Sequence, residues 1–445
     1  MIAKRAADAP HHTGLITFGT MLATIMQALD TTIANVALPH MQGTFSATQD
    51  QITWVLTSYI VAAAIMTPPT GWLAARFGRK RLYLVSVAGF TVASVLCAIA
   101  MTIDQAVIFR LLQGAFGAAL VPLSQATLLD NYPREKHGSA MAIWGLGIMV
   151  GPILGPMLGG WLTDNYSWRW VFYINVPVGV LAFFVISTFV TETPKNSKLR
   201  FDTFGFLTLS LAIGALQMFL DRGETKDWFG STEIVIEAAI AGLCFYLFLV
   251  HTFTTDKPFI SPALFRDRGF SASLVLIFIV GIMLYATMAL MPPFLQNLLD
   301  YPVVTTGLLL APRGVGTMIA MLLVGRAMRW ADPRLVLGVG LALSAYSLYW
   351  MEGFSLYVSS SDIVLSGVLQ GIGLGFTWVP LSTVAFATLA PALRTEAAGL
   401  FSLLRNVGSS AGISMVIVLL SQNTQINHAS LVAHVTPYNH LLQVP

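Results

Sequence analysis

Apolar, uncharged runs of about 20 residues recur along the whole length of this chain, and a run of that length can cross a bilayer. Without water, the backbone N–H and C=O groups of such a run must bond to one another, which leaves α-helices or a closed β-barrel. The runs lack the alternation of apolar and polar residues found in barrel strands. Only 10% of the residues are charged, whereas soluble domains have about a quarter. The sequence therefore predicts an all-α, polytopic membrane protein.

The apolar runs divide into thirteen predicted spans. The first run follows Lys4 and Arg5 as a signal peptide would, but it is too long for a cleaved apolar region and is predicted to be the first span. The predicted spans are 15–38, 52–75, 82–102, 104–129, 138–162, 169–190, 203–221, 233–254, 270–298, 304–328, 334–351, 361–388 and 394–420.

Lysine and arginine are distributed unevenly between the segments that connect these spans. If the N-terminus lies inside, the inner segments hold basic clusters such as 79–81, whereas the outer segments hold only Arg222 and Lys226. Short cytoplasmic loops of membrane proteins carry an excess of Lys and Arg. The distribution therefore predicts a cytoplasmic N-terminus.

Two distant segments of the sequence resemble each other. Leu112-Gln113-Gly114 and the Val-Pro-Leu-Ser of 121–124 recur as Leu369-Gln370-Gly371 and the Val-Pro-Leu-Ser of 379–382, about 257 residues later. Transporters are often built from such repeats. We therefore predict two pseudo-symmetric bundles of six helices each.

The repeat also predicts the limits of the parts. The first bundle is expected at 1–195, an inserted transmembrane hairpin at 196–258, and the second bundle, five helices and a polar tail, at 259–445. A counterpart of span 169–190 should fall near 427–448, but the residues there include three histidines and two prolines and cannot span. The last helix of the second bundle is therefore expected either to be missing from the chain or to lie beyond residue 445.

Asp30 lies inside the first predicted span, with Gln27 one helical turn before it and Ala34 one turn after it. A charge at membrane depth is costly and usually marks a functional site. We predict that Asp30 is a protonatable site. The alternative is a structural carboxylate that caps a neighbouring helix.

Arg110 is a second ionisable residue at membrane depth, and it shares a predicted helix face with Gln113 and Gly114. Its counterpart in the second half is Gly367, so the charge was not duplicated with the scaffold. We predict that Arg110 weakens the hold of an acid on its proton, or contacts water or substrate. The alternative is a fixed salt bridge between helices.

Candidates for a substrate cavity are polar, aromatic and methionine side chains in the spans. Methionine and aromatic surfaces adapt to varied ligands, although core packing or lipid contact is the simpler explanation. Glu237, Arg313 and Arg405 also fall in or near spans, and a position near a membrane interface is one simple explanation for each. The cavity candidates are Gln27, Asn35, Gln113, Tyr285, Met288, Gln296 and Gln370.

Two glycine-rich segments predict close packing or gating. A stripe of glycines in 147–160 allows another helix to approach closely, and its prolines would bend the span into a gate. The basic loop 71–81 permits a tight turn whose arginines could bind helix ends. The residues of the two segments are Gly147, Gly151, Pro152, Gly155, Pro156, Gly159 and Gly160, and Gly71, Arg76, Gly78, Arg79 and Lys80.

Other kinds of chemistry have little support in the sequence. Cys97 and Cys244 lie in apolar runs, so no disulfide or metal site is predicted. We find no phosphate loop and no nucleophile–base motif, and so predict no catalytic residue, no cofactor and no nucleic-acid partner. A membrane sensor or scaffold would need a soluble domain, and a membrane-embedded enzyme would need clustered His, Asp and Glu. We find neither feature in the sequence.

Five stretches together resemble the fourteen-span drug:proton antiporters of the EmrB/QacA type, a branch of the major facilitator superfamily. The likeness covers almost the whole chain. One departure is Ala75, where the basic loop of the family usually has an acid. The stretches are LDTTIANVALP (29–39), GWLAARFGRKR (71–81), RLLQG (110–114), GPILGPMLGG (151–160) and WRWVFYINVPVG (168–179).

The resemblance implies a major facilitator fold and proton-coupled efflux of drugs or other amphipathic small molecules by alternating access. It places Asp30 and Arg110 in the proton-coupling set and the protein in a bacterial inner membrane. Protons, a small-molecule substrate and the lipid bilayer are the implied partners, with a periplasmic adaptor protein and an outer-membrane channel in Gram-negative cells. The alternative on the same fold is an exporter or importer of a specific metabolite, such as an amino acid, a sugar or a siderophore.

Overall fold

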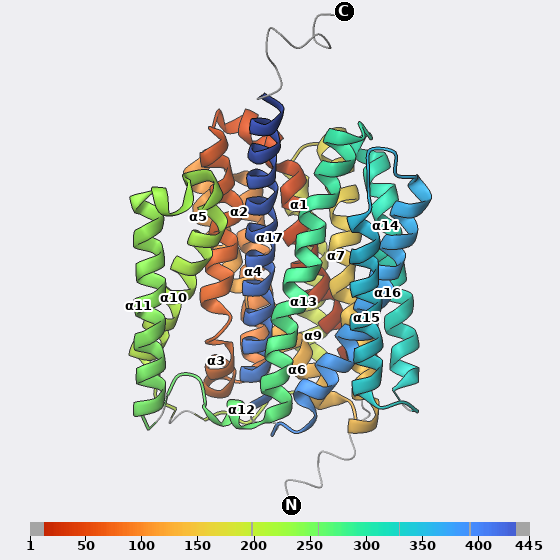
Figure 1. Ribbon diagram of the computed structural model, residues 1–445. Coiled ribbons are helices and arrows are strands. Elements are labelled where there is room, and N and C mark those ends of the chain that lie inside the picture. The colour runs from red at the N-terminus through yellow and green to blue at the C-terminus, as the bar shows by residue number, and fades with distance from the viewer. Residues whose placement is uncertain (1–12, 197–198, 257, 329, 391–392, 433–445) are drawn as a thin grey trace, which may run out of the picture.

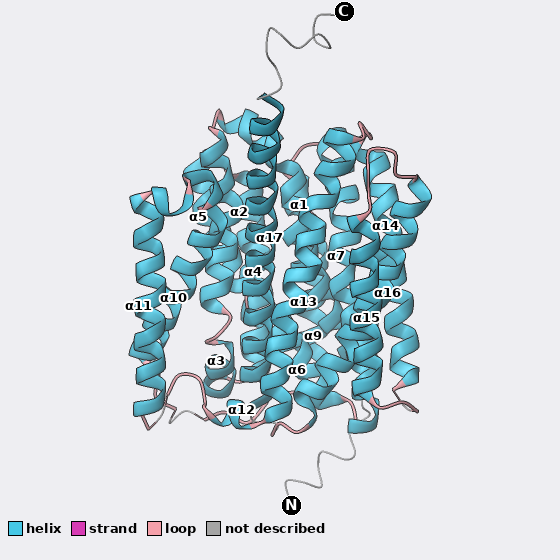
Figure 2. Ribbon diagram, viewed as in Figure 1, coloured by secondary structure: helices cyan, strands magenta, loops and turns pink. Residues whose placement is uncertain are grey.

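The computed structural model describes residues 13–196, 199–256, 258–328, 330–390 and 393–432. Every regular element in these ranges is a helix (Figure 2). The long helices stand side by side and run between two ends of the molecule (Figure 1). The all-α prediction is therefore confirmed for the described residues.

The helices of the first half precede residue 195. They are α1 (Thr13–Phe45), α2 (Gln49–Met66), α3 (Thr70–Phe77), α4 (Arg79–Ile99), α5 (Ile103–Gly117), α6 (Leu120–Asn131), α7 (His137–Asn165), α8 (Trp170–Tyr173) and α9 (Asn175–Phe189). The remaining helices are α10 (Thr203–Arg222), α11 (Thr232–Thr254), α12 (Ala263–Arg266), α13 (Arg268–Pro293), α14 (Val303–Ala327), α15 (Pro333–Glu352), α16 (Ser360–Ala387) and α17 (Arg394–Val432).

The helices occupy the segments that hydropathy predicts. Among the described residues, eleven segments are helical, long and apolar enough to cross a membrane, and α2 with α3 forms a twelfth that bends by 55°. Helix α7 has 29 residues, more than the about 20 that a bilayer needs. Together these segments coincide with the thirteen predicted spans.

Two predicted helix ends are wrong. Helix α1 continues through Pro39 to Phe45, and α17 continues to Val432, beyond the predicted ends at 38 and 420. Hydropathy detects only the part of a helix that lies in the apolar layer, whereas the backbone bonds that hold a helix continue into water. Proline removes one such bond and can remain within a helix that its neighbours support.

The predicted span 52–75 is interrupted, because α2 ends at Met66 and α3 begins at Thr70. Pro68 and Pro69 lie in the interruption. Neither has an N–H to donate, and a proline ring clashes with the carbonyl of the preceding turn. The two prolines therefore explain the bend.

The inserted hairpin, α10 and α11, stands at one edge of the molecule (Figure 1). Helix α10 packs against α2 and also touches α17. The proposed limits at 196 and 258 fall between helices, and the division into three parts remains a proposal.

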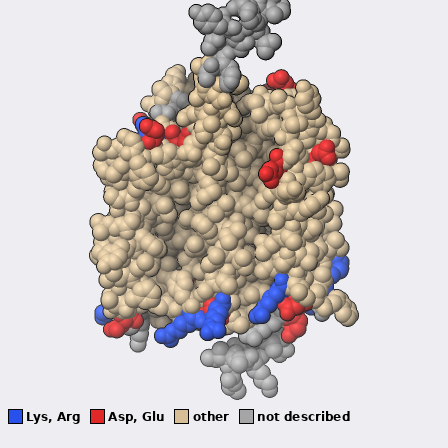
Figure 3. Space-filling model, in the orientation of Figure 1, with Lys and Arg blue, Asp and Glu red and all other residues tan. Residues whose placement is uncertain are grey.

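Charge is concentrated at the ends of the molecule. Figure 3 shows a mostly uncharged flank, with Lys and Arg gathered at the end where α1 begins. We call this the basic end. An uncharged flank is suited to contact with lipid tails.

Candidate functional site

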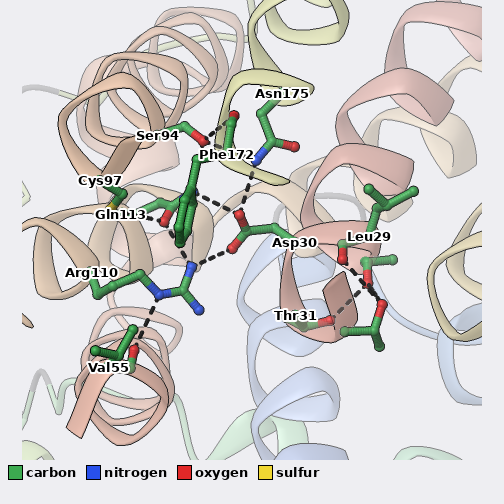
Figure 4. Close-up of polar contacts among 12 residues, drawn as sticks. Leu29, Asp30, Thr31, Val55, Ser94, Cys97, Arg110, Gln113, Phe172 and Asn175 are labelled. Carbon is green, nitrogen blue, oxygen red and sulfur yellow. Dashed lines mark hydrogen bonds and ion pairs between the residues drawn. The ribbon is translucent and has the colours of Figure 1, made fainter. Parts of the chain in front are cut away.

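Asp30 is the centre of a buried polar network in the first half (Figure 4). Its side chain is 0% exposed. Arg110 Nη1 donates to Asp30 Oδ2 over 2.7 Å, while Gln113 Nε2 and Asn175 Nδ2 donate to Oδ1 over 2.8 and 2.9 Å. Both carboxylate oxygens are therefore bonded by donors from α5 and α9.

Arg110 is held equally firmly, with 1% of its side chain exposed. Its Nε donates to the carbonyl of Val55 over 3.2 Å, and its Nη1 also donates to Gln113 Oε1 over 2.8 Å. The guanidinium lies 4.2 Å from the ring centroid of Tyr59, where a cation is attracted by the π-electrons. The predicted shared face of Arg110, Gln113 and Gly114 is confirmed, since all three are buried.

Ser94 on α4 completes the network. Its Oγ accepts from Gln113 Nε2 over 3.2 Å and from Asn175 Nδ2 over 2.9 Å, and donates to the carbonyl of Phe172 over 2.9 Å. The network thus joins α1, α2, α4, α5, α8 and α9. Removing either charged member would leave the other buried without its partner.

The glycines of α7 allow it to pack tightly against α1 on both sides of Asp30. A Cβ on Gly151 would lie 2.2 Å from the carbonyl oxygen of Ala28, and one on Gly155 would lie 2.1 Å from Thr32 Oγ1. Thr32 Oγ1 donates to the carbonyl of Gly151 over 2.9 Å. Close packing is therefore confirmed as one role of the stripe.

The rest of the glycine stripe follows the same line along α1. A Cβ on Gly147 would meet Met21 at 2.8 Å, one on Gly159 would meet Ile33 at 2.9 Å, and one on Gly160 would meet Val36 at 4.0 Å. Helix α7 is one continuous element. The side chains of Pro152 and Pro156 lie outside the described residues, and the gating role remains a prediction.

At the basic end, an ion-pair cluster connects the two halves. Asp130, at the end of α6, accepts from Arg79 over 2.5 Å and from Arg394, at the start of α17, over 2.6 Å. Both arginines also donate to carbonyls in the last turns of α6, those of Ala126 and Leu129. Arg79 therefore binds a helix end, as predicted. Asp130 provides a carboxylate at the basic end, where the basic loop has Ala75 in place of an acid.

The other residues of the basic loop have different contacts. Arg76 donates to the carbonyl of Leu199 over 2.5 Å and lies over the Trp72 ring. Gly78 has a φ of +95°, which glycine adopts without strain. The backbone N–H of Lys80 donates to Glu192.

Gly71, the first residue of the basic loop, lies beside the second half. A Cβ on Gly71 would lie 2.7 Å from the Cα of Glu396, near the start of α17. Only a glycine allows α3 to approach α17 so closely.

The predicted cavity residues differ in exposure. Gln113 and Gln370 are 0% exposed, and Gln370 Nε2 donates to Thr287 Oγ1 over 3.0 Å. The other five differ from these two in exposure. Asn35 is exposed, while Gln27, Tyr285, Met288 and Gln296 are half-buried.

Some residues of the site were missed by sequence reasoning. Asn175 lies in the stretch 168–179, where a polar side chain inside a span was a usable signal. We find no comparable sequence signal for Ser94, Tyr59 or the carbonyl of Val55. Asp130 and Arg394 are 264 residues apart, and only the folded chain brings them together.

Arg313 and Arg405 do not lie near the ends of their helices. Arg313 lies near the middle of α14, and Arg405 is three turns inside α17. Glu237 lies in the second turn of α11 and bonds to Arg222 near an end of the hairpin, which fits a position near a membrane interface.

With this geometry in view, the chain was compared with known proteins. Residues 20–413 match the family described as the Major Facilitator Superfamily. The chain belongs to the major facilitator superfamily. It is a multi-pass membrane transporter.

Similar sequences place the chain in the EmrB-type branch of the superfamily. The multidrug export protein EmrB of Haemophilus influenzae is 37% identical over 96% of this chain and 84% of that protein. The fatty acid resistance protein FarB of Neisseria gonorrhoeae is 35% identical over 95% of this chain and 84% of that protein. The EmrB protein of Escherichia coli K12 is 34% identical over 96% of this chain and 83% of that protein.

Solved structures support the major facilitator fold. The proton:xylose symporter XylE has a TM-score of 0.66 and 14% identity, over 93% of this chain and 90% of the other. The human organic anion transporter MFSD10 has a TM-score of 0.63 and 15% identity, over 92% of this chain and 93% of the other. At this identity the likeness concerns the fold alone.

Proposed function

We propose that this transporter exports drugs or other amphipathic small molecules across the bacterial inner membrane in exchange for protons. The names of its relatives support drug export, since proteins 37% and 34% identical to it are called multidrug export proteins. The observation that carries proton coupling is the Asp30–Arg110 pair, with 0% and 1% of the two side chains exposed. Such a pair deep in a membrane protein is a functional site by default.

The pair suggests how a proton could be coupled to movement. A proton on Asp30 and the guanidinium of Arg110 compete for the same carboxylate, which is bonded to Arg110 at 2.7 Å. Protonation removes the charge that holds Arg110 against α1. Among the described residues, Arg110 then keeps the carbonyl of Val55 and the Gln113 oxygen as acceptors. Two arrangements of α1 against α5 follow, and the proton selects between them.

The ion pairs at the basic end support alternating access. Asp130 joins Arg79 of the first half to Arg394 of the second half. We propose that this end faces the cytoplasm with the N-terminus, as the Lys and Arg distribution favours, and that the cluster holds it closed. Asp30 is shielded in this arrangement, so proton exchange requires the halves to move.

We expect the path to continue beyond the inner membrane. A periplasmic adaptor protein and an outer-membrane channel are the proposed partners in cells with two membranes. Co-purification of the transporter with an adaptor from the same cell envelope tests this expectation.

The central experiment measures drug efflux from proteoliposomes under an imposed proton gradient. Asp30→Asn keeps the size of the side chain but cannot carry an exchangeable acidic proton, so efflux should fall to background. Asp30→Glu should retain part of the activity, and Asp104→Asn, an exposed residue in the first turn of α5, is the matched control. Unchanged efflux in Asp30→Asn would refute the proton-coupling role.

A panel of structurally unrelated drugs tests the breadth of the substrate range. A multidrug exporter should protect cells against several of them. Protection against one metabolite alone would favour the narrower exporter or importer instead.

A further inference from the structure

Two arginines lie at membrane depth in the second half. Arg313 is ten residues inside α14 from Val303 and fourteen from Ala327, about 15 and 21 Å along the helix. Arg405 is eleven residues inside α17 from Arg394, about 16 Å from the basic end. Both side chains are half-buried. Neither can be explained as a charge at the membrane surface.

These arginines have no carboxylate partner among the described residues. Arg313 Nη2 donates to the carbonyl of Leu284 over 3.3 Å. Arg405 donates from Nε and Nη2 to Asn406 Oδ1 over 3.2 and 3.1 Å, and lies 5.7 Å from the ring centroid of Trp378. A guanidinium carries five N–H donors and a fixed charge. Most of these donors, and both charges, are therefore not satisfied by the described residues.

Both arginines approach the same part of α13. Arg313 reaches the carbonyl of Leu284 from α14. On α17, the carbonyl oxygen of Arg405 lies 2.5 Å from where a Cβ on Gly281 would be. The half-buried Tyr285 and Met288 follow on α13. The Arg313 side chain and the Arg405 backbone thus lie beside one stretch of α13, which carries soft, adaptable side chains.

Two nearby buried groups also have no hydrogen-bond partner within the part of the chain that the structure describes. The indole Nε1 of Trp378, beside Arg405, is unbonded although this residue is 2% exposed. Gln370 Oε1 is unbonded although the residue is 0% exposed. Buried polar groups are normally bonded, and the exceptions require an explanation.

The equivalent position in the first half holds a carboxylate, which the second half lacks. Thr287 lies 257 residues after Asp30, and Gln370 donates to Thr287 as Gln113 donates to Asp30. Arg110 corresponds to Gly367, where a Cβ would lie 3.6 Å from the Cβ of Arg313. The second half therefore has an arginine beside the equivalent position, but a hydroxyl where the first half has a carboxylate.

We propose that Arg313 and Arg405 bind the negatively charged headgroup of an amphiphilic cargo, such as a carboxylate, sulfonate or phenolate with an apolar tail. The cargo supplies the anion that the second half lacks. Arginine suits this task because its planar donors match the oxygens of such groups and its charge is permanent. Tyr285 and Met288 would contact the tail. This inference rests on the proposed function and names its substrate class.

The charges determine how such transport is driven. Export of one monovalent anion against entry of one proton moves two positive charges inward in effect. The membrane potential therefore drives the exchange together with the proton gradient. A cationic cargo exchanged for one proton would be insensitive to the potential.

The first test measures equilibrium binding to the protein in lipid nanodiscs, with empty nanodiscs as the reference for lipid partitioning. Octanesulfonate and octyltrimethylammonium have the same tail and fixed opposite charges. The protein should bind octanesulfonate at least about tenfold more tightly. Equal binding, or a preference for the cation, would overturn the proposal.

Variants then locate the site. Arg313→Gln and Arg405→Gln should each weaken octanesulfonate binding about tenfold or more, because each removes a charged donor. The lysine variants should keep part of the affinity. Arg222→Gln is the matched control, since Arg222 pairs with Glu233 in the hairpin, and it should have no effect. Full affinity in both glutamine variants would contradict the assignment.

Thr287→Asp provides a test that does not remove an arginine. The new carboxylate would stand one turn from the carbonyl that Arg313 contacts, and would act as an internal competitor for the headgroup. We expect a loss of about tenfold in octanesulfonate affinity, with Thr287→Asn unchanged. If Thr287→Asp binds the anion as well as the native chain, the proposal fails.

Binding in nanodiscs needs no proton gradient, so the two proposals can fail separately. Loss of anion binding in the arginine variants, with no proton-driven efflux of any drug, would support the site and refute the transport function. Proton-driven efflux without preference for the anion would do the reverse.

Discussion

The two halves place a buried glutamine at corresponding positions, but its surroundings differ. In the first half, Gln113 bonds to Asp30, and Arg110 neutralises the carboxylate at 2.7 Å. In the second half, Gln370 bonds to the hydroxyl of Thr287, and the nearest arginines at that depth have no acid among the described residues. A duplicated scaffold has therefore kept its hydrogen bond and changed its charge balance.

The difference suggests that the two halves have different roles. The first half contains an ion and its counter-ion, so it is complete without a ligand and suited to a proton that competes for the carboxylate. The second half contains uncompensated positive charge, which a ligand can neutralise. On this view the first half provides coupling and the second half provides recognition.

The largest expected effect comes from breaking the pair in the first half. Arg110→Gln leaves Asp30 buried without its counter-ion and should lower the free energy of unfolding by about 3–5 kcal/mol. The double variant Asp30→Asn/Arg110→Gln should recover much of the lost stability, but it should not recover transport. In the second half, Arg313→Gln should be nearly neutral for stability, because no buried counter-ion is left behind. Melting temperatures in detergent rank the stabilities of these variants. A large loss of stability in Arg313→Gln would contradict the proposed difference between the halves.

The next effect compares two glycines 257 residues apart. A Cβ on Gly114 would lie 2.4 Å from the carbonyl oxygen of Tyr59, and one on Gly371 would lie 2.0 Å from that of Arg313. Alanine at either position should cost about 1–3 kcal/mol through overpacking.

The two glycine variants should differ in function. Gly114→Ala should impair proton coupling, since Tyr59 lies against Arg110, whereas Gly371→Ala should weaken anion binding and leave coupling intact. Efflux and binding assays on the same preparations separate the two. Gly160→Ala, where the nearest atom is 4.0 Å away, is the control, and identical functional defects would contradict the division.

A smaller effect is expected where the halves meet. Asp130→Asn removes the anion shared by Arg79 and Arg394, whose side chains are 9% and 7% exposed, and should favour opening of the basic end. A cysteine at Ala142, which packs near Gly325 of α14, should then react several-fold faster with a water-soluble reagent. The new cysteine is introduced into a chain that carries Cys97→Ser and Cys244→Ser, so that the two native cysteines do not react. Equal labelling with and without Asp130 would show that the cluster does not hold this end closed.

The smallest effect concerns the start of α13. A hydrogen bond from Thr388 lowers the pKa of Asp267, helped by the backbone N–H groups of Phe270 and Gly269 and opposed by partial burial. A lowered pKa stabilises the fold above the pKa of the unfolded chain, near 3.9, and this contribution is lost as the pH falls through the folded-state value. Thr388→Val should therefore lower stability at pH 7 by about 1 kcal/mol or less.

The same substitution should flatten the acid limb of the stability curve, measured by melting temperature between pH 3 and pH 7. The effect belongs to the second half alone and should leave the Asp30 network unchanged. A native pH dependence in Thr388→Val would show that this bond does not control the titration of Asp267.

Much of the fold was accessible from the sequence. The thirteen apolar segments, the repeat and the shared face of Arg110 and Gln113 were predicted, because each depends on order along one helix. The bend at Pro68–Pro69 and the helical extension to Val432 were not predicted. Hydropathy averages over a window and records neither a local break nor the continuation of a helix into water.

The site was only partly accessible. Asp30 and Arg110 stood out because a charge inside an apolar run is rare. Asn175 and Ser94 did not, because small polar residues are common in spans and their roles depend on which helices meet. Arg313 and Arg405 fell within predicted spans, but their partners also depend on which helices meet.

By itself, the sequence determined that this chain crosses a membrane repeatedly as helices, in two related halves, with few charges inside. Those properties follow from the cost of leaving polar groups unbonded in an apolar layer, which acts on each segment separately. Only the tertiary structure decided which charges are paired. Asp30 meets Arg110 and Asp130 meets Arg394 because separate helices pack together, and packing leaves Arg313 and Arg405 without an acid among the described residues.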